Sequence, residues 1–531
     1  MKILKLSICI IGIALISSSC ELLNPQPKSP VEAKATTIED ISILPEPLNT
    51  EAGGSSFIIF DALSVLSNPS QEKNQTALIS GLEERIGFAP ELIENNRDYQ
   101  ITLSVAPLSK EEVWMVDTTN EALLNEAYIL EISEKNILLK AATDEGLFRG
   151  IQSLLQLVPN QSMTEGEQEV YVLPTVKIVD MPQMEIRSAM LDVARHFFSV
   201  DEVKRYINQL ALYKFNTFHM HLTDDQGWRV EMKNWPALTE IGAATEVGGG
   251  AGGFYTQEEF TELINYAADR HIEIIPEIDM PGHTNAAIVS YPQLNGNGKT
   301  PEVYTGTNVG FSTFDANNEE VYAFLDDILG QFAAISPSKY IHIGGDESHV
   351  TKKKDYIKFV ERVEALVRKH GKVAVGWDEI TQADISGPAV VQLWNNEENA
   401  LVGVEKGMPI LLSPAKKAYL DMKYNEDSEF GLNWAAYIEL EDAYNWNPST
   451  YFSDLDPSVI LGLEAPLWSE TIYDSASLEY LAFPRAIAYA ELAWTQSDKY
   501  NWERFKTKLK SHGTWLEKQE INFYRSTEID W

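Results

Sequence analysis

The chain has 531 residues, of which 42 are basic and 79 acidic, giving a net charge of −37. This length predicts more than one domain, and so acidic a surface argues against nucleic acid as a partner because it repels phosphate groups. The 12 Trp and 22 Tyr supply flat apolar rings, which suit the binding of a neutral sugar face.

The first twenty residues have the layout of a cleaved export signal: Lys2 and Lys5, an apolar run, then small residues ending at Cys20. The end of this segment resembles a bacterial lipobox. We therefore expect 1–20 to be a lipoprotein signal peptide and Cys20 to be lipidated, holding the protein to a bacterial membrane on its periplasmic face or at the cell surface. An uncleaved anchor and ordinary secretion are the alternatives. The one other cysteine is Cys9, so the mature chain has no disulfide.

Two regions precede the main domain. Residues 21–50 are rich in proline and poorly patterned, which predicts a linker. Residues 51–180 contain short alternating runs at 99–105, 126–133 and 136–142, typical of strands, and an apolar helical pattern at 145–158. They predict a small α+β accessory domain with a structural role.

From residue 181 to 531 the pattern becomes a regular alternation of strand and helix. Expected helices cover 201–215, 256–271, 319–335, 355–370 and, at the C-terminal end, 477–494. Eight near-continuous apolar runs are expected as strands: 185–194, 216–223, 272–280, 339–345, 372–377, 389–394, 409–414 and 459–468. This order predicts an α/β fold, a (β/α)₈ TIM barrel. A doubly wound sheet is less favoured because no glycine-rich phosphate turn follows the first strand, and GGGAGG at 248–253 is expected as a flexible surface loop.

Acidic or aromatic residues stand at every expected strand end, where a barrel of this kind builds its active site. In chain order they are Asp192 with Arg195 and His196, Asp224 and Asp225 with Trp228, Asp279 and His283, Asp346 and Glu347, Trp377, Trp394, Tyr419 and Asp421, and Trp468 and Glu470. Carboxylates with aromatic walls indicate carbohydrate chemistry. His219 and His221, with His196 and Asp224, have a spacing that some metal sites use, but we expect no metal and no cofactor.

The adjacency of Asp346 and Glu347 restricts the mechanism. Glycosidases that use two carboxyl groups hold them about 5–5.5 Å apart for retention or about 6.5–9.5 Å apart for inversion. Neighbouring residues of a strand point in different directions, so this pair is poorly placed to flank one bond. The substrate's 2-acetamido group can then act as nucleophile, with Glu347 as acid and base and Asp346 orienting the acetamide. Asp279 or Asp192 as a conventional nucleophile stays open.

The chain resembles glycoside hydrolase family 20, the β-N-acetylhexosaminidases. The resemblance is carried by HIGGDE at 342–347 and, in the order of the family, by LDVARHFF at 191–198, HLTDDQGW at 221–228, PEIDMPGH at 276–283, VGW at 375–377, YLDMKY at 419–424 and APLWSE at 465–470. It spans about residues 185–530, and the preceding α+β domain also fits the usual arrangement of the family.

The resemblance implies a role for each site residue. Asp346 would be the polarising aspartate and Glu347 the general acid and base. Substrate binding would fall to Arg195 and Glu470 at the sugar hydroxyls, Tyr419 at the acetamido oxygen, Asp421 at a neighbouring hydroxyl, Asp224 and His283 in support, and Trp377, Trp394, Trp434 and Trp468 as walls.

The implied activity is exo-hydrolysis of terminal N-acetylglucosamine or N-acetylgalactosamine, with N-acetylhexosamine-containing glycans as partners. A disaccharide-releasing enzyme similar to lacto-N-biosidases and a non-catalytic glycan-binding lipoprotein are the alternatives.

Overall fold

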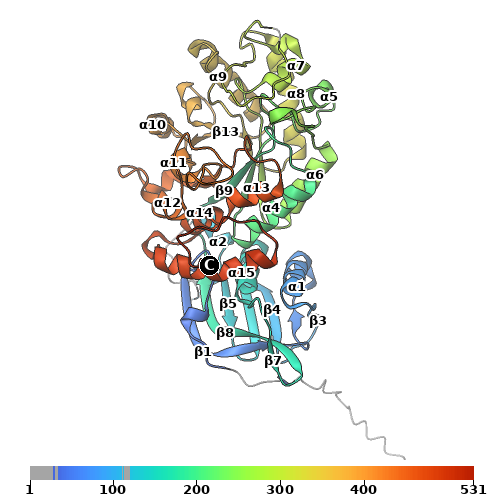
Figure 1. The fold of residues 1–531 in the computed structure, drawn as a ribbon, viewed down its shortest axis with the longest axis vertical. Coiled ribbons are helices and arrows are strands. Elements are labelled where there is room, and N and C mark those ends of the chain that lie inside the picture. Colours follow the sequence, from blue (N-terminus) through green and yellow to red (C-terminus); the bar gives the residue numbers. More distant parts are fainter. Residues whose placement is uncertain (1–27, 30–33, 110–111, 113–119, 300) are drawn as a thin grey trace, which may run out of the picture.

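The computed structural model describes residues 28–29, 34–109, 112, 120–299 and 301–531. The expected signal peptide and Cys20 lie outside these residues. A small sheet domain and a larger barrel are stacked end to end (Figure 1). Within the described part of the chain, no helix has the length and apolarity needed to cross a membrane.

The smaller domain is a mixed eight-stranded sheet in the order β1-β8-β5-β6-β4-β2-β3, with β7 paired to β8. Its strands are β1 Asn49–Ile59, β2 Ser64–Leu66, β3 Glu91–Ile93, β4 Gln100–Val105, β5 Tyr128–Ile132, β6 Asn136–Ala141, β7 Met163–Glu165 and β8 Gln168–Asp180. Its helices are α1 Glu72–Ile86, α2 Glu121–Asn125 and α3 Asp144–Leu157. The three expected strands and the expected helix are all present.

Helix α3 is buried along nearly its whole length because it lies between the sheet and the barrel. Its apolar residues pack on β4, β5 and β6. On its other side the Arg149 guanidinium donates to the backbone carbonyls of Phe215 and His271, which belong to the barrel. The small domain is therefore attached through a buried helix.

The linker expected over 21–50 is wrong in its second half. Ile41, Ile43 and Leu44 are buried, and Leu48 belongs to a small buried apolar cluster with Ala127 and Met181. The C-terminal helix α15 (Trp502–Lys518) holds this segment, since His512 contacts the Ser42 carbonyl. Apolar residues at 41–48 thus belong to the core, although proline-rich composition hid their pattern.

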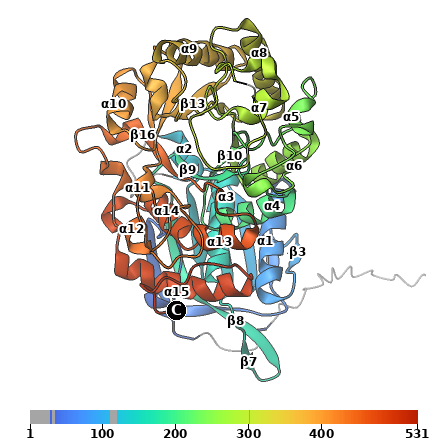
Figure 2. The same ribbon diagram turned by 45° about the horizontal axis from the view of Figure 1, so that its top comes forward.

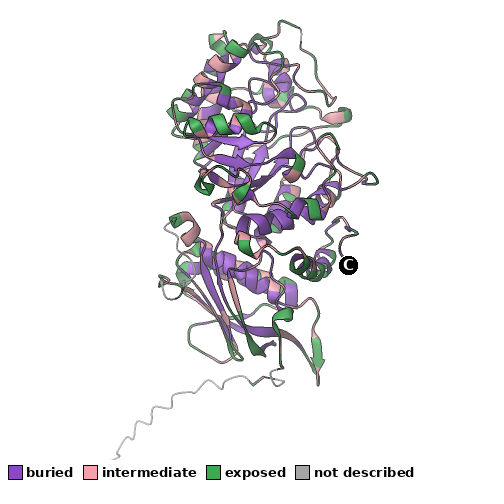
Figure 3. Cartoon of the chain, turned by 90° about the vertical axis from the view of Figure 1, so that its left-hand side faces the viewer, coloured by how far each residue is buried: buried purple, intermediate pink, exposed green. Residues whose placement is uncertain are grey.

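The larger domain is a closed barrel of eight parallel strands, as expected. Its strands are β9 Ile186–Asp192, β10 Thr217–His221, β11 Glu273–Glu277, β12 Tyr340–His342, β13 Val373–Trp377, β14 Ala389–Leu393, β15 Ile410–Leu412 and β16 Ile460–Ala465. Each lies inside one of the eight predicted runs, and β16 pairs with β9 to close the ring. Because helices surround the strands, both strand faces are buried, which explains the near-continuous apolar runs (Figure 3).

The ring of helices around the barrel is visible when the molecule is tilted (Figure 2). The helices are α4 Val200–Leu212, α5 Ala237–Glu240, α6 Gln257–Ala268, α7 Asn285–Ser290, α8 Glu319–Ile335, α9 Lys353–Lys369, α10 Glu397–Glu405, α11 Ala415–Ala418, α12 Leu440–Tyr444, α13 Ser475–Ala482 and α14 Arg485–Trp494. The single helix expected over 477–494 is two helices, because Pro484 has no N–H to continue the first one.

A buried charge cluster joins the two domains. Glu126, at the end of α2, accepts from Arg149 of α3 and from Arg187 of β9, and all three side chains are almost fully buried. Burial alone would raise the pKa of Glu126, but the charges of Arg187 and Arg149 outweigh it and lower the pKa. The carboxylate therefore stays ionised between two guanidinium groups.

We expect Glu126→Gln to destabilise the protein by about 3–5 kcal/mol, because it leaves two buried cations under-compensated. Chemical denaturation followed by circular dichroism measures this loss. Glu121→Gln, at the exposed start of the same helix, is the matched control and should change stability little. Equal midpoints for the two variants would contradict this role of the cluster.

Candidate active site

The loop after β12 carries Asp346 and Glu347 in a conformation that its glycines permit. Gly344 and Gly345 have φ angles of 65° and 106°. A Cβ at Gly344 would lie 1.7 Å from Oδ1 of Asp279, so no larger residue fits there. The Tyr356 hydroxyl of α9 donates to the Gly345 carbonyl at 2.6 Å and fixes the loop. Glu347 itself has φ 44°, which is uncommon for a non-glycine residue.

The two carboxylates converge on one histidine. Nε2 of His283 lies 3.7 Å from an oxygen of Asp346 and 3.7 Å from an oxygen of Glu347. The premise that strand alternation separates the pair is therefore wrong, because β12 ends at His342 and the pair lies on a left-handed loop. The side chains stand beside each other on the same imidazole.

The surroundings set the protonation of Glu347 and of His283. Burial, and then the charge of Asp346, raises the pKa of Glu347 to about 7. Burial opposes the charge of His283, but Asp224, Asp279 and Asp346 raise the pKa of His283 well above its usual value. At neutral pH a cationic histidine thus faces the pair, and Glu347 is poised to hold or release a proton.

Asp224 connects this histidine to Arg195. Its carboxylate accepts from Nδ1 of His283 at 3.2 Å and pairs with the Arg195 guanidinium at 2.8 Å. Burial opposes ionisation, but the charges of Arg195 and His283 lower the pKa of Asp224. Nε of Arg195 is buried without a partner among the described residues, and it is free to bind a ligand oxygen.

Aromatic rings continue the site around the barrel mouth. Arg195 stacks on Trp468, whose ring centroid lies 5.8 Å from Trp377 and 6.3 Å from Tyr419. Trp434 lies 6.1 Å from both Tyr419 and Trp394. Trp377 is fully buried and Trp434 is 55% exposed, so these rings extend from the barrel interior to the surface.

Asp421 and Glu470 supply acceptors that the protein does not use. Both oxygens of Asp421 and Oε2 of Glu470 are buried without a partner in the described structure. Burial, followed by the charge of Glu470, raises the pKa of Asp421 well above its usual value. Such groups are suited to pair with the hydroxyls of a ligand. All twelve catalytic and substrate-binding residues expected from the sequence are therefore brought together, and their individual roles stay predictions.

The two alternative nucleophiles are enclosed. Asp192 is fully buried and accepts the backbone N–H groups of Ala194, Arg195 and Ser469. Asp279 is 1% exposed and accepts the Gly345 N–H at 3.1 Å. Burial, and then the charge of Asp346, raises the pKa of Asp279, which disfavours its ionised, nucleophilic form. Both residues thus support the loops that carry the site.

The histidines of β10 belong to a polar network in the barrel core beneath the site. Nε2 of His219 and Nδ1 of His221 lie 3.0 and 2.5 Å from the same oxygen of Glu277. Nδ1 of His342 lies 2.9 Å from the other oxygen. His219, His342 and Glu277 are close enough to hold a metal ion. Nδ1 of His219 also lies 2.9 Å from an oxygen of Glu464, whereas Nε2 of His342 has no hydrogen-bond partner among the described residues. His196 lies apart from this network and contacts the Ser469 carbonyl.

Sequence reasoning missed two acids. Glu277 also accepts from the indole N–H of Trp377 at 2.9 Å, and it connects through His221 to Asp224. Glu379 accepts from the indole N–H of Trp394 at 3.0 Å. Burial, then Asp378 and Asp346, raises the pKa of Glu379 to about 8. Glu277 could have been found because it is an acid inside the apolar run IEIIPEIDM at 272–280, which was expected to be a buried strand.

We expect Glu277→Gln to lower kcat/KM about 100-fold, because displacing Trp377 and His221 by about 1 Å misplaces the groups that hold the substrate. Steady-state kinetics, with circular dichroism to verify folding, measures the effect. Glu273→Gln at the other end of β11 is the control and should behave as the unmodified protein. A folded Glu277→Gln variant with unchanged kcat/KM would disprove the positioning role.

Family comparisons agree with this architecture. The model of the glycosyl hydrolase family 20 catalytic domain matches residues 185–497, and that of domain 2 of the same family matches residues 40–181. A beta-N-acetylhexosaminidase of Cellulomonas fimi is 40% identical over 410 residues, covering 77% of this chain and 82% of that protein. A beta-hexosaminidase of Porphyromonas gingivalis is 32% identical over 91% of this chain, which spans 64% of that longer protein.

Solved structures share the whole fold. The GH20 beta-N-acetylhexosaminidase of Streptomyces coelicolor superposes with a TM-score of 0.87 at 38% identity, covering 94% of this chain and 100% of that one. A mutant Streptomyces plicatus beta-hexosaminidase in complex with its product GlcNAc gives 0.86 at 38% identity, covering 94% and 99%.

Proposed function

The chain belongs to glycosyl hydrolase family 20, and on that premise we propose that it is an exo-acting β-N-acetylhexosaminidase. It releases terminal, non-reducing N-acetylglucosamine or N-acetylgalactosamine with retention of configuration. The observation that carries the proposal is the convergence of Asp346 and Glu347 on His283, at a barrel mouth where the rings of Trp377 and Tyr419 both contact Trp468.

In the first step the 2-acetamido oxygen of the substrate attacks the anomeric carbon while the glycosidic C–O bond breaks. Glu347, with its pKa of about 7, gives its proton to the leaving oxygen. Asp346 accepts the acetamide N–H and offsets the positive charge of the oxazolinium ion. Burial, followed by the charges of Asp421 and Asp346, raises the pKa of Tyr419, so its hydroxyl remains a donor for the acetamide oxygen.

In the second step Glu347 acts as a base. It takes a proton from water as the water oxygen attacks the anomeric carbon, and the acetamide is restored. Two inversions at the same carbon give net retention. Arg195, Asp421 and Glu470 hold the hydroxyls of the sugar with the free donor and acceptor atoms described above.

Release of chromophore from aryl β-N-acetylglucosaminide, compared with the aryl β-glucoside, tests the proposal. Only the acetamido substrate should be cleaved, and a thiazoline mimic of the cyclised intermediate should inhibit. Binding without release from any aryl N-acetylhexosaminide would favour the non-catalytic alternative. Release of disaccharides alone would favour an enzyme similar to lacto-N-biosidases.

The pH profile should show the ionisation of Glu347. The residue must be protonated to act as acid, so kcat/KM should fall as pH rises through about 7, where Glu347 loses its proton. For a substrate with a poor leaving group the fall approaches tenfold per pH unit. Steady-state rates from pH 5 to 9 measure this fall. If kcat/KM of Glu347→Gln falls in the same way above pH 7, the ionisation does not belong to Glu347.

We also propose that Cys20 is lipidated and anchors the protein to a bacterial membrane, from the lipobox-like end of the first twenty residues. Expression of the full chain in a bacterium should place it in the membrane fraction, and Cys20→Ser should release it into the soluble exported fraction. Equal fractionation of both forms would contradict the anchor.

A further inference from the structure

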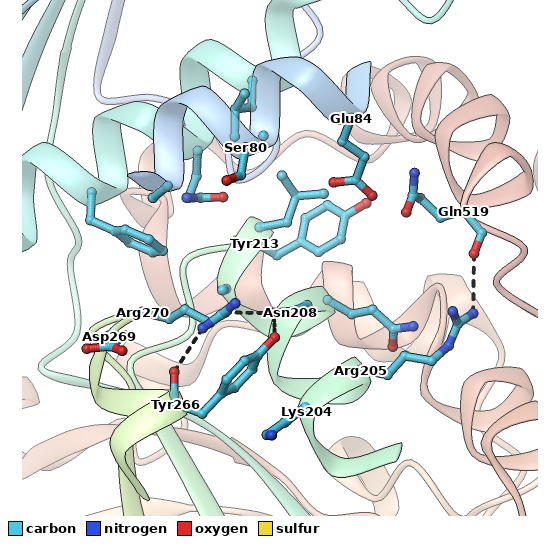
Figure 4. A pocket seen from close by; sticks show the side chains of 18 of the residues that line it. Ser80, Glu84, Lys204, Arg205, Asn208, Tyr213, Tyr266, Asp269, Arg270 and Gln519 are labelled. Atoms are coloured by element: carbon cyan, nitrogen blue, oxygen red, sulfur yellow. Dashed lines mark hydrogen bonds between the residues drawn. The ribbon is translucent and has the colours of Figure 1, made fainter. Parts of the chain in front are cut away.

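A cavity lies far from the barrel mouth, in the cleft between the small domain and the barrel. Its volume is about 1000 Å³, within the range of ligand pockets. Figure 4 shows Ser80 and Glu84 of α1 on one wall, with Asn208 of α4 and Tyr266 of α6 on the opposite wall. Residues of α15 close one end. The reaction proposed above does not use this cleft.

The charge of the cleft differs from that of the rest of the molecule. Five basic and four acidic side chains line it, whereas the whole chain has 42 basic and 79 acidic residues. Three of the cations, Lys73, Lys204 and Arg205, are paired with carboxylates. The Arg270 guanidinium donates to the amide oxygen of Asn208 and to the Tyr266 carbonyl, and it stacks on the Tyr266 ring. Arg85 and Arg270 are thus the two cations of the cleft that have no carboxylate partner among the described residues.

Arg85 differs from the other buried arginines of the described chain because its guanidinium has no hydrogen-bond or ion-pair partner. The buried arginines are Arg85, Arg149, Arg187, Arg195, Arg229 and Arg485. Arg149, Arg187 and Arg195 pair with carboxylates. Arg229 and Arg485 donate to several backbone carbonyls. The Arg85 guanidinium makes no hydrogen bond or ion pair with any described residue, although the side chain is only 5% exposed and lines the cleft.

The environment of Arg85 presents its guanidinium edge to a ligand. One face stacks on Trp515 of α15, with its central carbon 3.6 Å from the ring centroid. Gln152 of α3, which is 7% exposed and also lines the cleft, makes no side-chain hydrogen bond with a described residue. Burying an unpaired cation is costly, and an anion bound in the plane of the guanidinium would compensate it.

We propose that this interdomain cleft is a second binding site, which takes a small anion bearing a carboxylate or a phosphate group with Arg85 as its anchor. The planar fork of Arg85 binds two oxygens of the anion. The remaining donors come from Gln152 and from the edge of Arg270. Since the cleft lies between α1 and α4, an occupant contacts both domains.

Isothermal titration calorimetry of the full-length protein tests this site, with inorganic phosphate and with glucuronate at constant ionic strength. We expect saturable binding of at least one anion, and the stronger of the two identifies the group. Arg85→Met, which keeps a stem to pack on Trp515, should weaken binding at least tenfold and leave hexosaminidase activity unchanged. Arg362→Met is the matched control, because Arg362 also stacks on an aromatic ring, at 3.4 Å from the centroid of Tyr322.

No saturable binding of either anion to the unmodified protein would overturn the proposal, whatever the variants do. Equal affinities in Arg85→Met and Arg362→Met would overturn it as well. Arg85→Lys gives a further measurement if Arg85→Met does not fold. It keeps the charge and loses the planar fork, so binding should weaken and not vanish.

Discussion

Glu347→Gln is expected to lower kcat about 10²–10⁴-fold on a natural glycan, the range that a positioned general acid contributes. Glutamine keeps the size of the side chain and its place beside His283 but cannot give a proton to the leaving oxygen. The first step then depends on the leaving group alone. Steady-state kinetics on an N-acetylglucosamine disaccharide measure the loss.

The leaving group distinguishes loss of the acid from general damage to the site. A dinitrophenyl leaving group needs no proton, so its release in the first step should be nearly normal in Glu347→Gln. The second step still lacks its base, and a burst of chromophore should precede slow turnover. Glu361→Gln on the outer side of α9 serves as the control. An equal loss for good and poor leaving groups, with no burst, would contradict the acid role.

The barrel could be predicted from the sequence because each of its strands is marked by the composition of its own few residues. A strand covered on both faces must be apolar almost throughout, and each of the eight runs has that composition. The segment 41–48 could not be predicted in the same way. Its apolar residues are held by α15, more than 450 residues away in the chain, and no local period marks that contact.

The residues of the site could be predicted from the sequence, but their positions relative to one another could not. Barrel topology alone brings the strand ends together, so residues as distant as Arg195 and Glu470 could be assigned to one pocket. The relation of Asp346 to Glu347 depends on the φ angles of Gly344, Gly345 and Glu347, which strand alternation does not describe. Glu277 was missed because its importance lies in contacts with His219, His221, His342 and Trp377, which stand on three other strands.

Asp346→Asn is expected to lower kcat about 10²–10³-fold, the cost of removing one group aimed at charge that develops in the transition state. The asparagine amide fits the same space beside His283 but carries no charge to offset the oxazolinium ion. Its N–H₂ group can also face the acetamide N–H. Both effects act on the substrate's own nucleophile.

A fluorinated substrate series makes this prediction specific to acetamido participation. Each fluorine on the acetyl methyl weakens the carbonyl oxygen as a nucleophile, so kcat of the unmodified enzyme should fall steadily from acetyl to trifluoroacetyl. Asp384→Asn, at a 91% exposed side chain, should show the same slope and the same rates. Asp346→Asn should be slow throughout. If fluorination leaves kcat unchanged, the nucleophile belongs to the protein, and the division of labour between Asp346 and Glu347 does not hold.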